Sequence, residues 1–392
     1  MELGKRQRRA MIITGEASGD LHGAHLIKAA RELDPDLEFF GVGGKHMADA
    51  GCELVLRGEE LAVMGLVEVL GHLPTLYRAF RRLKKLLHGE QRPDVLVLID
   101  FQEFNLLLAR AAKKAGVPVL FFVGPTVWAW RRGRVKKMAR AVDRLAVIFP
   151  FEPDYYAGED IEVEYVGHPL LDEARATRPR DDFLGEAGLD VGRPVVGLFP
   201  GSRNSELKYN LPTMLEAAQR VAGQLPDTQF LLPVATSFKL EDMRRRLDKC
   251  VLPIQLVQGD VYDVANACDA ILSVSGTVTL QIALVGTPMA IIYKTAPLNY
   301  AIGKRVVKLP HIGMPNIVAG REIVREFIQD QATAESLSEE IIKILTNTEY
   351  RSTLRQNLAE VSGHMGEAGC AKRVAEMASA LSRRGAVKEQ FS

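Results

Sequence analysis

The feature that most constrains this chain is an alternation of short apolar runs with amphipathic segments, which continues over most of its length. The apolar runs are continuous, as in "DVLVLID" at 94–100 and "AILSVS" at 270–275. Continuous aliphatic runs are typical of parallel strands that are buried on both faces. Because helical periodicity fills the intervals between them, the sequence predicts an α/β fold with doubly wound parallel sheets.

The same pattern gives expected positions for the main elements. We expect strands at 10–15, 37–42, 94–99, 117–123 and 143–148 in the first half, and at 195–200, 228–234, 254–257, 269–274 and 288–293 in the second half. We expect covering helices at 20–32, 105–115, 211–224 and 333–345.

The alternation restarts after a break. Residues 172–194 are charged and rich in Gly and Pro, and a new buried strand begins at Val195. We therefore predict a Rossmann-like domain at 1–171 and a second one at 172–347, which face each other across a cleft. The segment 348–392 is expected to form C-terminal helices that return to the first domain. A cleft of this kind is the default place for a binding site.

The charge and cysteine patterns exclude several classes of protein. The chain has 392 residues and a formal net charge of +1, which argues against a nucleic-acid-binding protein. Its 4 cysteines show no C-x-x-C spacing, so they predict neither a zinc site nor a disulfide framework. Pairs of acidic residues that could chelate a metal ion are scarce. One such pair, Asp34 and Asp36, lies where a turn is expected. We therefore expect neither a metal ion nor another cofactor.

No segment has the pattern of a membrane-spanning helix or a secretory signal. The apolar segment behind the basic N-terminus, 10–13, is too short for a signal peptide. The most apolar stretch, 117–130, is interrupted by Gly124 and Pro125 and falls short of the ~20 residues that a spanning helix needs. We expect a cytoplasmic protein.

The second half opens with the motif "PGSR" directly after a buried strand. Gly201 lets the backbone approach a ligand, Ser202 donates, and Arg203 offers a bidentate fork that suits phosphate. Asn210 is expected to cap the next helix, with Pro212 in its first turn. The alternative is an ordinary turn that carries a surface arginine.

A second loop with this chemistry follows the strand at 269–274. Ser275, Gly276 and Thr277 lie at the start of an expected helix, where hydroxyl and backbone N–H groups converge. Plain helix capping is the alternative. Two such loops at the ends of separate strands in one domain predict a diphosphate held between them.

A third polar loop lies in "MPNIVAGREIV" at 314–324. Asn316 and Glu322 frame this loop, and a carboxylate here can accept from a ribose diol. A solvated glutamate in the first turn of a helix is an equally good interpretation.

The first half carries acidic groups at its strand ends. The loop "GEASGD" at 15–20 has neither the Lys and Ser/Thr pair of a P-loop nor the G-x-G-x-x-G fingerprint. Asp100 ends the strand at 94–99, where a carboxylate points into the crevice and can act as a general base. Helix capping is the alternative for Asp100, and Glu103 is a second candidate base.

Two segments combine basic and apolar residues. The segment 61–88 is apolar first and basic after, and 127–140 places both tryptophans beside a basic run. Contact with an anionic membrane surface explains the charge and the apolar content together. The alternative is a buried tryptophan pair and a solvated basic helix face.

These motifs together resemble the lipid-A-disaccharide synthase family, glycosyltransferases of the two-Rossmann type called GT-B. The matching stretches run in order along the chain: "GEASGD" at 15–20, "ELAVMG" at 60–65, "ID" at 99–100, "PTVWAWR" at 125–131, "FPFE" at 149–152, "GHPL" at 167–170, "PGSR" at 200–203, "SGT" at 275–277 and "PNIVAGRE" at 315–322. Gln281 stands where the family usually has Glu, so this position keeps hydrogen-bonding capacity but loses a charge.

The resemblance implies an inverting, metal-free transfer of a 2,3-diacylglucosamine from UDP to 2,3-diacylglucosamine 1-phosphate, which forms a β-1′,6 bond. The second half is then expected to hold the UDP, with Arg203 on the leaving diphosphate, and the first half the lipid acceptor. Glu16 and Ser18 are expected to orient sugar, and Asp100 to take the proton from the attacking 6-hydroxyl, with Glu16 as the other candidate base. Substrates with acyl chains imply a peripheral position at the inner membrane.

Two other functions fit the same sequence. A UDP-sugar 2-epimerase of this architecture needs acids around the sugar but no lipid surface, so dependence of activity on acyl chains separates it from a lipid A enzyme. A non-catalytic membrane-surface binder that keeps the fold would bind lipid without turnover.

Overall fold

The computed structural model describes residues 7–58, 66–89, 91–129, 133–248, 250–306 and 309–390, without the side chains of 17, 66–73, 306 and 387–390. The chain divides into two compact units: Met1–Asp172 with Glu367–Ser392, and Glu173–Gly366. Each unit is built on one parallel sheet. The prediction of an α/β fold with two Rossmann-like domains is therefore confirmed.

The first unit contains a seven-stranded sheet in the order β3-β2-β1-β4-β5-β6-β7. Its strands are β1 (Arg8–Ile13), β2 (Leu37–Gly43), β3 (Glu53–Arg57), β4 (Val95–Ile99), β5 (Val119–Phe122), β6 (Arg144–Val147) and β7 (Glu162–Tyr165). Its helices are α1 (Ala17–Leu33), α2 (Lys45–Asp49), α3 (Leu66–Leu86), α4 (Gln102–Lys114), α5 (Arg134–Ala139), the short η2 (Pro153–Tyr156) and α16 (Cys370–Gln390).

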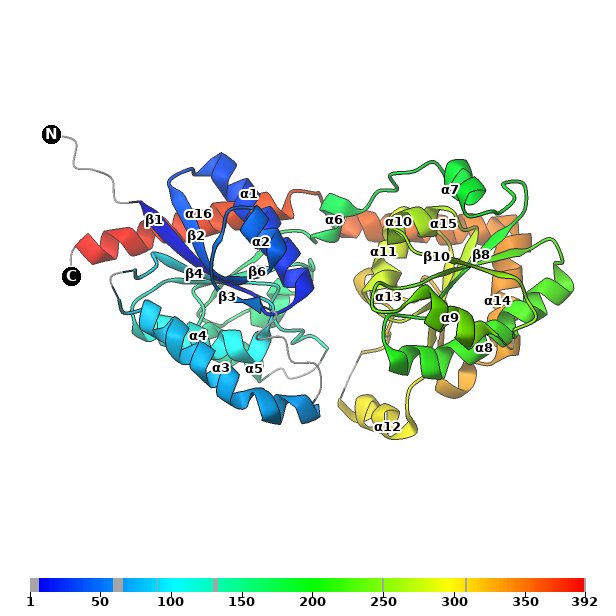
Figure 1. Ribbon diagram of the computed structural model, residues 1–392, viewed down its shortest axis with the longest axis horizontal. Coiled ribbons are helices and arrows are strands. Elements are labelled where there is room, and N and C mark those ends of the chain that lie inside the picture. Colours follow the sequence, from blue (N-terminus) through cyan, green and yellow to red (C-terminus); the bar gives the residue numbers. More distant parts are fainter. Residues whose placement is uncertain are drawn as a thin grey trace. The chain divides into compact units, whose positions relative to one another are not determined.

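Alternation along buried strands sends side chains into two cores, one on each face of this sheet. In β4, Leu96 and Leu98 join the core under α3 and α4, whereas Val97 and Ile99 join the core under α1 and α16. Figure 1 shows α1, α2 and α16 on one face of the sheet and α3, α4 and α5 on the other. Burial on both faces is the reason that the sequence of β4 is a continuous apolar run.

The second unit contains a six-stranded sheet in the order β10-β9-β8-β11-β12-β13. Its strands are β8 (Val195–Phe199), β9 (Gln229–Pro233), β10 (Ile254–Val257), β11 (Ala270–Val274), β12 (Met289–Tyr293) and β13 (Glu326–Ile328). Its helices are α7 (Arg180–Glu186), α8 (Asn204–Gln224), α9 (Leu240–Leu247), α10 (Val261–Asn266), α11 (Thr277–Val285), α12 (Pro297–Val306), α13 (Met314–Ala319), the short η3 (Gln329–Gln331), α14 (Ala334–Thr346) and α15 (Thr348–His364); α6 (Leu170–Glu173) leads into this unit.

Both sheets reverse their winding direction at one point. In the first sheet β1 lies between β2 and β4, and in the second sheet β8 lies between β9 and β11. Ligands of doubly wound sheets bind outside the carboxyl ends of the strands at such a reversal. The loops that follow β1 and β4, and those that follow β8 and β11, are therefore the expected binding regions.

The start of α8 corrects one prediction. The helix begins at Asn204 after Arg203, so Asn210 lies inside it and does not cap it, and Pro212 lies beyond its first turn. Asn210 is buried, and its side chain donates to Lys294 O at 3.1 Å and accepts from Lys294 N at 2.8 Å. Asn210 thereby ties α8 to the end of β12.

The C-terminal segment 348–392 is divided between the two units. Helix α15 packs on α11, α13 and α14 of the second unit, whereas α16 packs on α1, β1, β4 and β5 of the first. Asp34 anchors α16, because its buried carboxylate accepts from Arg8 at 2.6 Å and from the hydroxyl of Ser379. Burial raises the pKa of Asp34 and its partners Arg8 and Ser379 lower it, with a net shift below the ordinary value.

Among the described residues, no helix combines the length and the apolar content that crossing a bilayer requires.

Candidate functional site

A hollow of about 530 Å³ lies in the second unit, at the carboxyl ends of β8, β9, β10 and β11. Six residues that the sequence predicts for ligand binding line it: Gly201, Ser202, Arg203, Ser275, Gly276 and Thr277. Residues 233–236 and 258–259, Glu206 and Gln281 are among the others that line it. The two predicted anion-binding loops therefore meet in one place, at the reversal of the second sheet.

The loop after β8 is held by Glu206, a residue that sequence reasoning did not single out. The Glu206 carboxylate accepts from Ser202 N at 2.8 Å and from Arg203 N at 3.2 Å, and so caps the start of α8. Gly201 has φ +99°, and a Cβ built there would lie 2.2 Å from Glu206 Oε2. Glycine is therefore required at 201 on two grounds, its left-handed backbone and the close approach of a carboxylate.

Arg203 lines this hollow with a largely exposed side chain. Its side chain is 78% exposed and donates to Glu206 Oε1 at 3.1 Å. Exposed pairs of this kind contribute only about 0–1 kcal/mol, so little free energy is needed to turn the guanidinium toward a ligand. The backbone amides of Ser202 and Arg203, in contrast, already have an acceptor in Glu206.

The loop after β11 presents the start of α11 to the hollow. Thr277 is the first residue of α11, and Gly276 before it supplies no side-chain cap. The first amides of α11 thus lack the capping oxygen that α8 has, and a helix start of this kind carries roughly half a positive charge. The hydroxyl of Ser275 is engaged elsewhere, since it donates to Ile312 O at 2.8 Å.

Asn316 and Glu322 do not line the hollow. Asn316 is fully buried and accepts from Ile323 N at 2.8 Å and from Val324 N at 3.0 Å. It donates to Val324 O and to Glu326, and the Glu326 carboxylate accepts from the amide of Ile312 at 3.0 Å.

The hydrogen bonds of Asn316 and Glu326 fix the segment around Ile312, whose carbonyl oxygen accepts from Ser275. Glu322 is exposed; its contact with a ribose stays a prediction.

In the first unit, Asp100 follows β4 in a left-handed conformation with φ +49°, and Phe101 continues it with φ +43°. Buried Asn105, which sequence reasoning missed, donates to the carbonyl oxygens of Ile99 at 3.2 Å and Asp100 at 2.8 Å. Positive φ at two successive non-glycine residues is costly and persists only where the surroundings enforce it. No sequence signal marks Asn105, because its role depends on the shape of the turn.

Asp100 and Glu16 are electrostatically coupled. Burial raises the pKa of Asp100 to about 6, and the nearby carboxylate of Glu16 contributes to this rise. Their loops are in contact, because β1 pairs with β4 and a Cβ on Gly15 would lie 2.7 Å from the Phe101 ring. The structure therefore brings two of the predicted catalytic groups together at the reversal of the first sheet.

The third acid of this loop, Asp20, has a structural role. It is buried and accepts from Gly44 N at 2.6 Å, His46 N at 3.0 Å and Met47 N at 3.2 Å, at the start of α2. Glu16 and Ser18, in contrast, are exposed.

Trp128 is a buried tryptophan. It is 8% exposed, and its Nε1 donates to Glu152 Oε1 at 3.2 Å. Its ring meets Phe149 and Phe151 edge to face, with centroid distances of 5.9 and 5.4 Å. Burial raises the pKa of Glu152 to about 7. Trp130, with the arginines 131 and 132, lies outside the described residues.

The second candidate base, Glu103, is exposed and pairs with Arg134 of α5. Its carboxylate therefore has a cationic partner, whereas Asp100 is the half-buried acid of this strand end.

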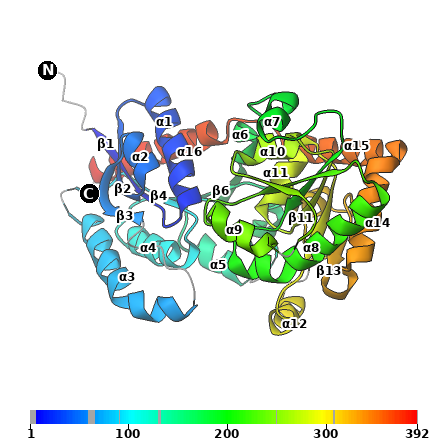
Figure 2. The same cartoon turned by 45° about the vertical axis from the view of Figure 1, so that its right-hand side comes forward.

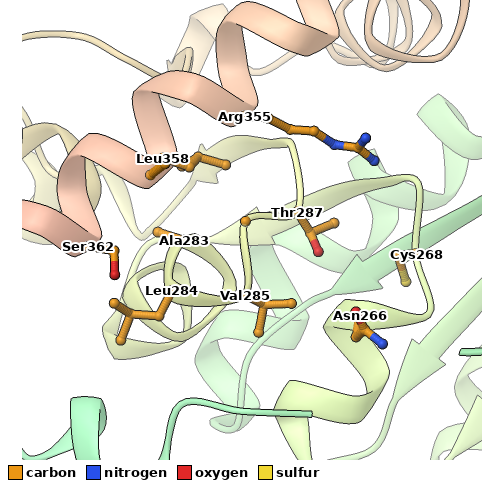
Figure 3. Close-up of a pocket in the computed structure, with 11 residues that line it drawn as sticks. Asn266, Cys268, Ala283, Leu284, Val285, Thr287, Arg355, Leu358 and Ser362 are labelled. Carbon is orange, nitrogen blue, oxygen red and sulfur yellow. The ribbon is translucent and has the colours of Figure 1, made fainter. Parts of the chain in front are cut away.

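A second hollow, of about 510 Å³, lies at the other end of α11 (Figure 3). Asn266, Cys268, Thr287, Arg355 and Ser362 are among its lining residues. It shares no lining residue with the first hollow, and none of the predicted site residues lines it. It adjoins the carbonyl end of α11, which disfavours an anionic ligand.

Comparison with known proteins gives one family. Residues 10–378 match the family model of lipid-A-disaccharide synthetase. The lipid-A-disaccharide synthase of Syntrophotalea carbinolica is 63% identical, with 99% of each chain covered. The enzyme of the same name from Geobacter sulfurreducens is 50% identical, with 94% of this chain and 95% of the relative covered.

Among solved structures, UDP-GlcNAc 2-epimerase from Neisseria meningitidis, determined with bound UDP-GlcNAc, aligns with a TM-score of 0.62 at 12% identity, covering 94% of this chain and 99% of the epimerase. At this identity the likeness shows the fold alone.

Proposed function

The chain belongs to the lipid-A-disaccharide synthase family, and from that premise we propose that its second unit holds the UDP of the donor and its first unit deprotonates the acceptor. The chain is a glycosyltransferase of lipid A biosynthesis that uses a sugar-nucleotide donor and lipid substrates. Its reaction moves a 2,3-diacylglucosamine from UDP to 2,3-diacylglucosamine 1-phosphate. The product has a β-1′,6 linkage, formed with inversion, and UDP is released.

The two alternatives that the sequence left open are not favoured. The relatives that cover nearly the whole chain are synthases at 63% and 50% identity, whereas the epimerase likeness has only 12% identity. A non-catalytic binder would not need a strand-end carboxylate whose pKa is raised by burial and by a neighbouring acid, as that of Asp100 is.

We assign the diphosphate of the donor to the start of α11, against the amides of Thr277 and Val278. The uncapped helix start in the 530 Å³ hollow supports this assignment, as does the engagement of the Ser202 and Arg203 amides by Glu206. The guanidinium of Arg203 turns from Glu206 to the phosphates and stabilises the negative charge that develops on the leaving UDP. Gly201 and Ser202 shape the opposite wall.

The walls of this hollow are fixed by groups behind them. Asn316 and Glu326 hold the segment at 312–313, which accepts the hydroxyl of Ser275. We assign Asn316 to this supporting role.

Asp100 is the general base. Its pKa of about 6 leaves it mostly ionised at neutral pH while keeping it more basic than an ordinary aspartate. As the 6-hydroxyl oxygen attacks the anomeric carbon from the face opposite UDP, the proton passes to Asp100. The bond to UDP breaks, and the leaving phosphate oxygen takes its electron pair. Glu16 and Ser18, exposed beside it, orient the sugar.

Both substrates carry acyl chains, so we place the enzyme at the surface of the inner membrane. The segment 61–88 is the predicted contact in the first unit, with apolar residues before basic ones. Residues 61–65 and the side chains of 66–73 lie outside the described residues, so this contact rests on the sequence pattern.

The observation that carries the proposal is the meeting of the "PGSR" and "SGT" loops in one hollow at the sheet reversal. The test is to incubate the enzyme with UDP-2,3-diacylglucosamine and the 1-phosphate acceptor and to follow UDP and disaccharide by mass spectrometry. Stoichiometric UDP and disaccharide are expected. Epimerised donor without disaccharide would contradict the proposal, as would UDP release that does not depend on the acceptor.

A further inference from the structure

Helix α12 of the second unit exposes apolar side chains that no described part of the unit covers. Leu298 is 71% exposed and Ile302 is 53% exposed, and they lie one turn apart on the same face of the helix. Tyr300 and Gly303, on the opposite face, are half-buried. Figures 1 and 2 both show α12 standing off the body of its unit.

The charged side chains of this helix are all basic. The last turn of α12 carries Lys304 and Arg305, both exposed, and the helix contains no acid. The sequence has no Asp or Glu from Ala270 through Arg321. Arg305 lies two turns from Leu298 on the same face, so its guanidinium flanks the apolar stripe. Exposed leucine and isoleucine beside arginine and lysine match an anionic lipid surface.

The position of α12 connects it with the donor hollow. β11 ends at Val274 and pairs in parallel with β12, with Val274 opposite Ile292. The amide of Ser275, in the hollow, donates to Ile292 O at 3.2 Å, and α12 begins at Pro297, shortly after β12 ends. Helix α12 therefore leaves the sheet from the same edge at which the donor hollow opens.

We propose that α12 is a membrane-docking helix of the second unit, which inserts Leu298 and Ile302 into an anionic leaflet beside the donor hollow. The inference rests on the proposed function in one respect, that the donor carries acyl chains and comes from a bilayer. Docking here keeps the mouth of the hollow near the lipid, so that the UDP headgroup can enter while its acyl chains need little exposure to water.

A bilayer fits this face better than a second copy of the chain. A stable protein interface buries about 800 Å² on each partner, and the apolar part of α12 consists of little more than Leu298 and Ile302. A bilayer accepts a small insertion, because basic side chains add roughly 1 kcal/mol each at an anionic surface.

The test compares two variants in vesicle co-sedimentation. Leu298→Ser with Ile302→Ser removes the apolar contact, and Val251→Ser is the matched control, since Val251 is 90% exposed in the same unit and far in sequence from α12. With vesicles that contain phosphatidylglycerol, we expect the double variant to bind roughly tenfold more weakly than wild type. The control is expected to bind like wild type.

A second pair of measurements separates docking from damage to the hollow. UDP affinity by calorimetry and turnover on detergent-dispersed substrates should be unchanged in the double variant, whereas turnover on vesicle-borne donor should fall. Lys304→Gln with Arg305→Gln should weaken binding at low salt only, because charge attraction is screened.

Two outcomes would overturn the proposal. One is vesicle binding of the double variant equal to that of wild type. The other is a loss of oligomers in ultracentrifugation with unchanged vesicle binding, which would make this face a protein interface. If wild type fails to bind UDP or to form disaccharide, the proposed function fails, while the vesicle comparison still decides the role of α12.

Discussion

The side-chain amide of Asn105 donates to the backbone carbonyl of Asp100 at 2.8 Å. This hydrogen bond closes a turn in which Asp100 and the next residue both have positive φ. Such a conformation costs about 1–3 kcal/mol per residue and needs enforcement by its surroundings. Asn105 therefore determines where the carboxylate of the proposed base points.

Asn105→Ala should lower both stability and turnover. The variant leaves two backbone carbonyls without their donor in a buried site, which costs about 1–3 kcal/mol. We expect a lower melting temperature and a reduced kcat, because Asp100 loses its fixed orientation. UDP affinity should be retained, since the donor hollow is built from other residues. An unchanged kcat in a destabilised variant would limit Asn105 to a purely structural role.

Asp100→Asn should abolish most turnover while preserving the fold. Loss of a general base typically lowers the rate about 10²–10⁴-fold. Because burial raises the pKa of Asp100 in the folded protein, the neutral side chain is favoured there, and an asparagine should not destabilise it. Stopped-time disaccharide assays and thermal melts measure the two effects. Full turnover in the variant would move the base to Glu16 or to water.

The pH profile should follow the ionisation of Asp100. The base works only when it is deprotonated, so kcat/KM should rise with pH through about 6 and level off above it. Glu16 contributes to the raised pKa of Asp100, so Glu16→Gln should move this rise to lower pH. Profiles of wild type and variant with the same midpoint would show that Glu16 does not act on the catalytic group.

The sequence predicted strands best where they are buried on both faces. The strands that it missed, β3, β7 and β13, lie at the edges of the two sheets and read "ELVLR", "EVEY" and "EFI". An edge strand has one neighbour and exposed charged side chains, so it lacks the continuous apolar run of β4 or β11. The ten predicted strand segments all coincide with observed strands, with ends that differ by a residue or two.

The candidate site was predictable where residue type alone carries the chemistry. Glycine and hydroxyl residues at strand ends identified the loops after β8 and β11, which meet in one hollow. Glu206 and Asn105 were missed because their roles depend on loops that fold back within a few residues. Asn316 shows the opposite case, since a buried amide that closes a loop looks the same in sequence as one that contacts a ligand.

Arg203→Ala should reduce turnover without loss of stability. Single electrostatic donors to a transition state contribute about 2.7–4 kcal/mol, which corresponds to roughly 10²–10³ in kcat. The Arg203 side chain is 78% exposed, so its removal should leave the melting temperature unchanged. Arg245→Ala is the matched control, because Arg245 is also exposed and pairs with an acid three residues away, Asp242. Equal kcat in both variants would place the diphosphate away from Arg203.

Gly201→Ala should destabilise the second unit and weaken UDP binding. Its φ of +99° is unfavourable for alanine, and the new Cβ would lie 2.2 Å from Glu206 Oε2, so the carboxylate that caps α8 must move. Backbone strain of this kind costs about 1–3 kcal/mol.

Gly223→Ala is the matched control, and its expected change in stability has the opposite sign. Gly223 lies inside the same helix with nothing within 4 Å of a built Cβ, and alanine there should stabilise by about 0.5–1 kcal/mol. Urea midpoints and UDP calorimetry measure both variants. If Gly201→Ala keeps the wild-type midpoint and UDP affinity, the loop is not held by Glu206 in solution, and the amides of Ser202 and Arg203 are available to the diphosphate after all.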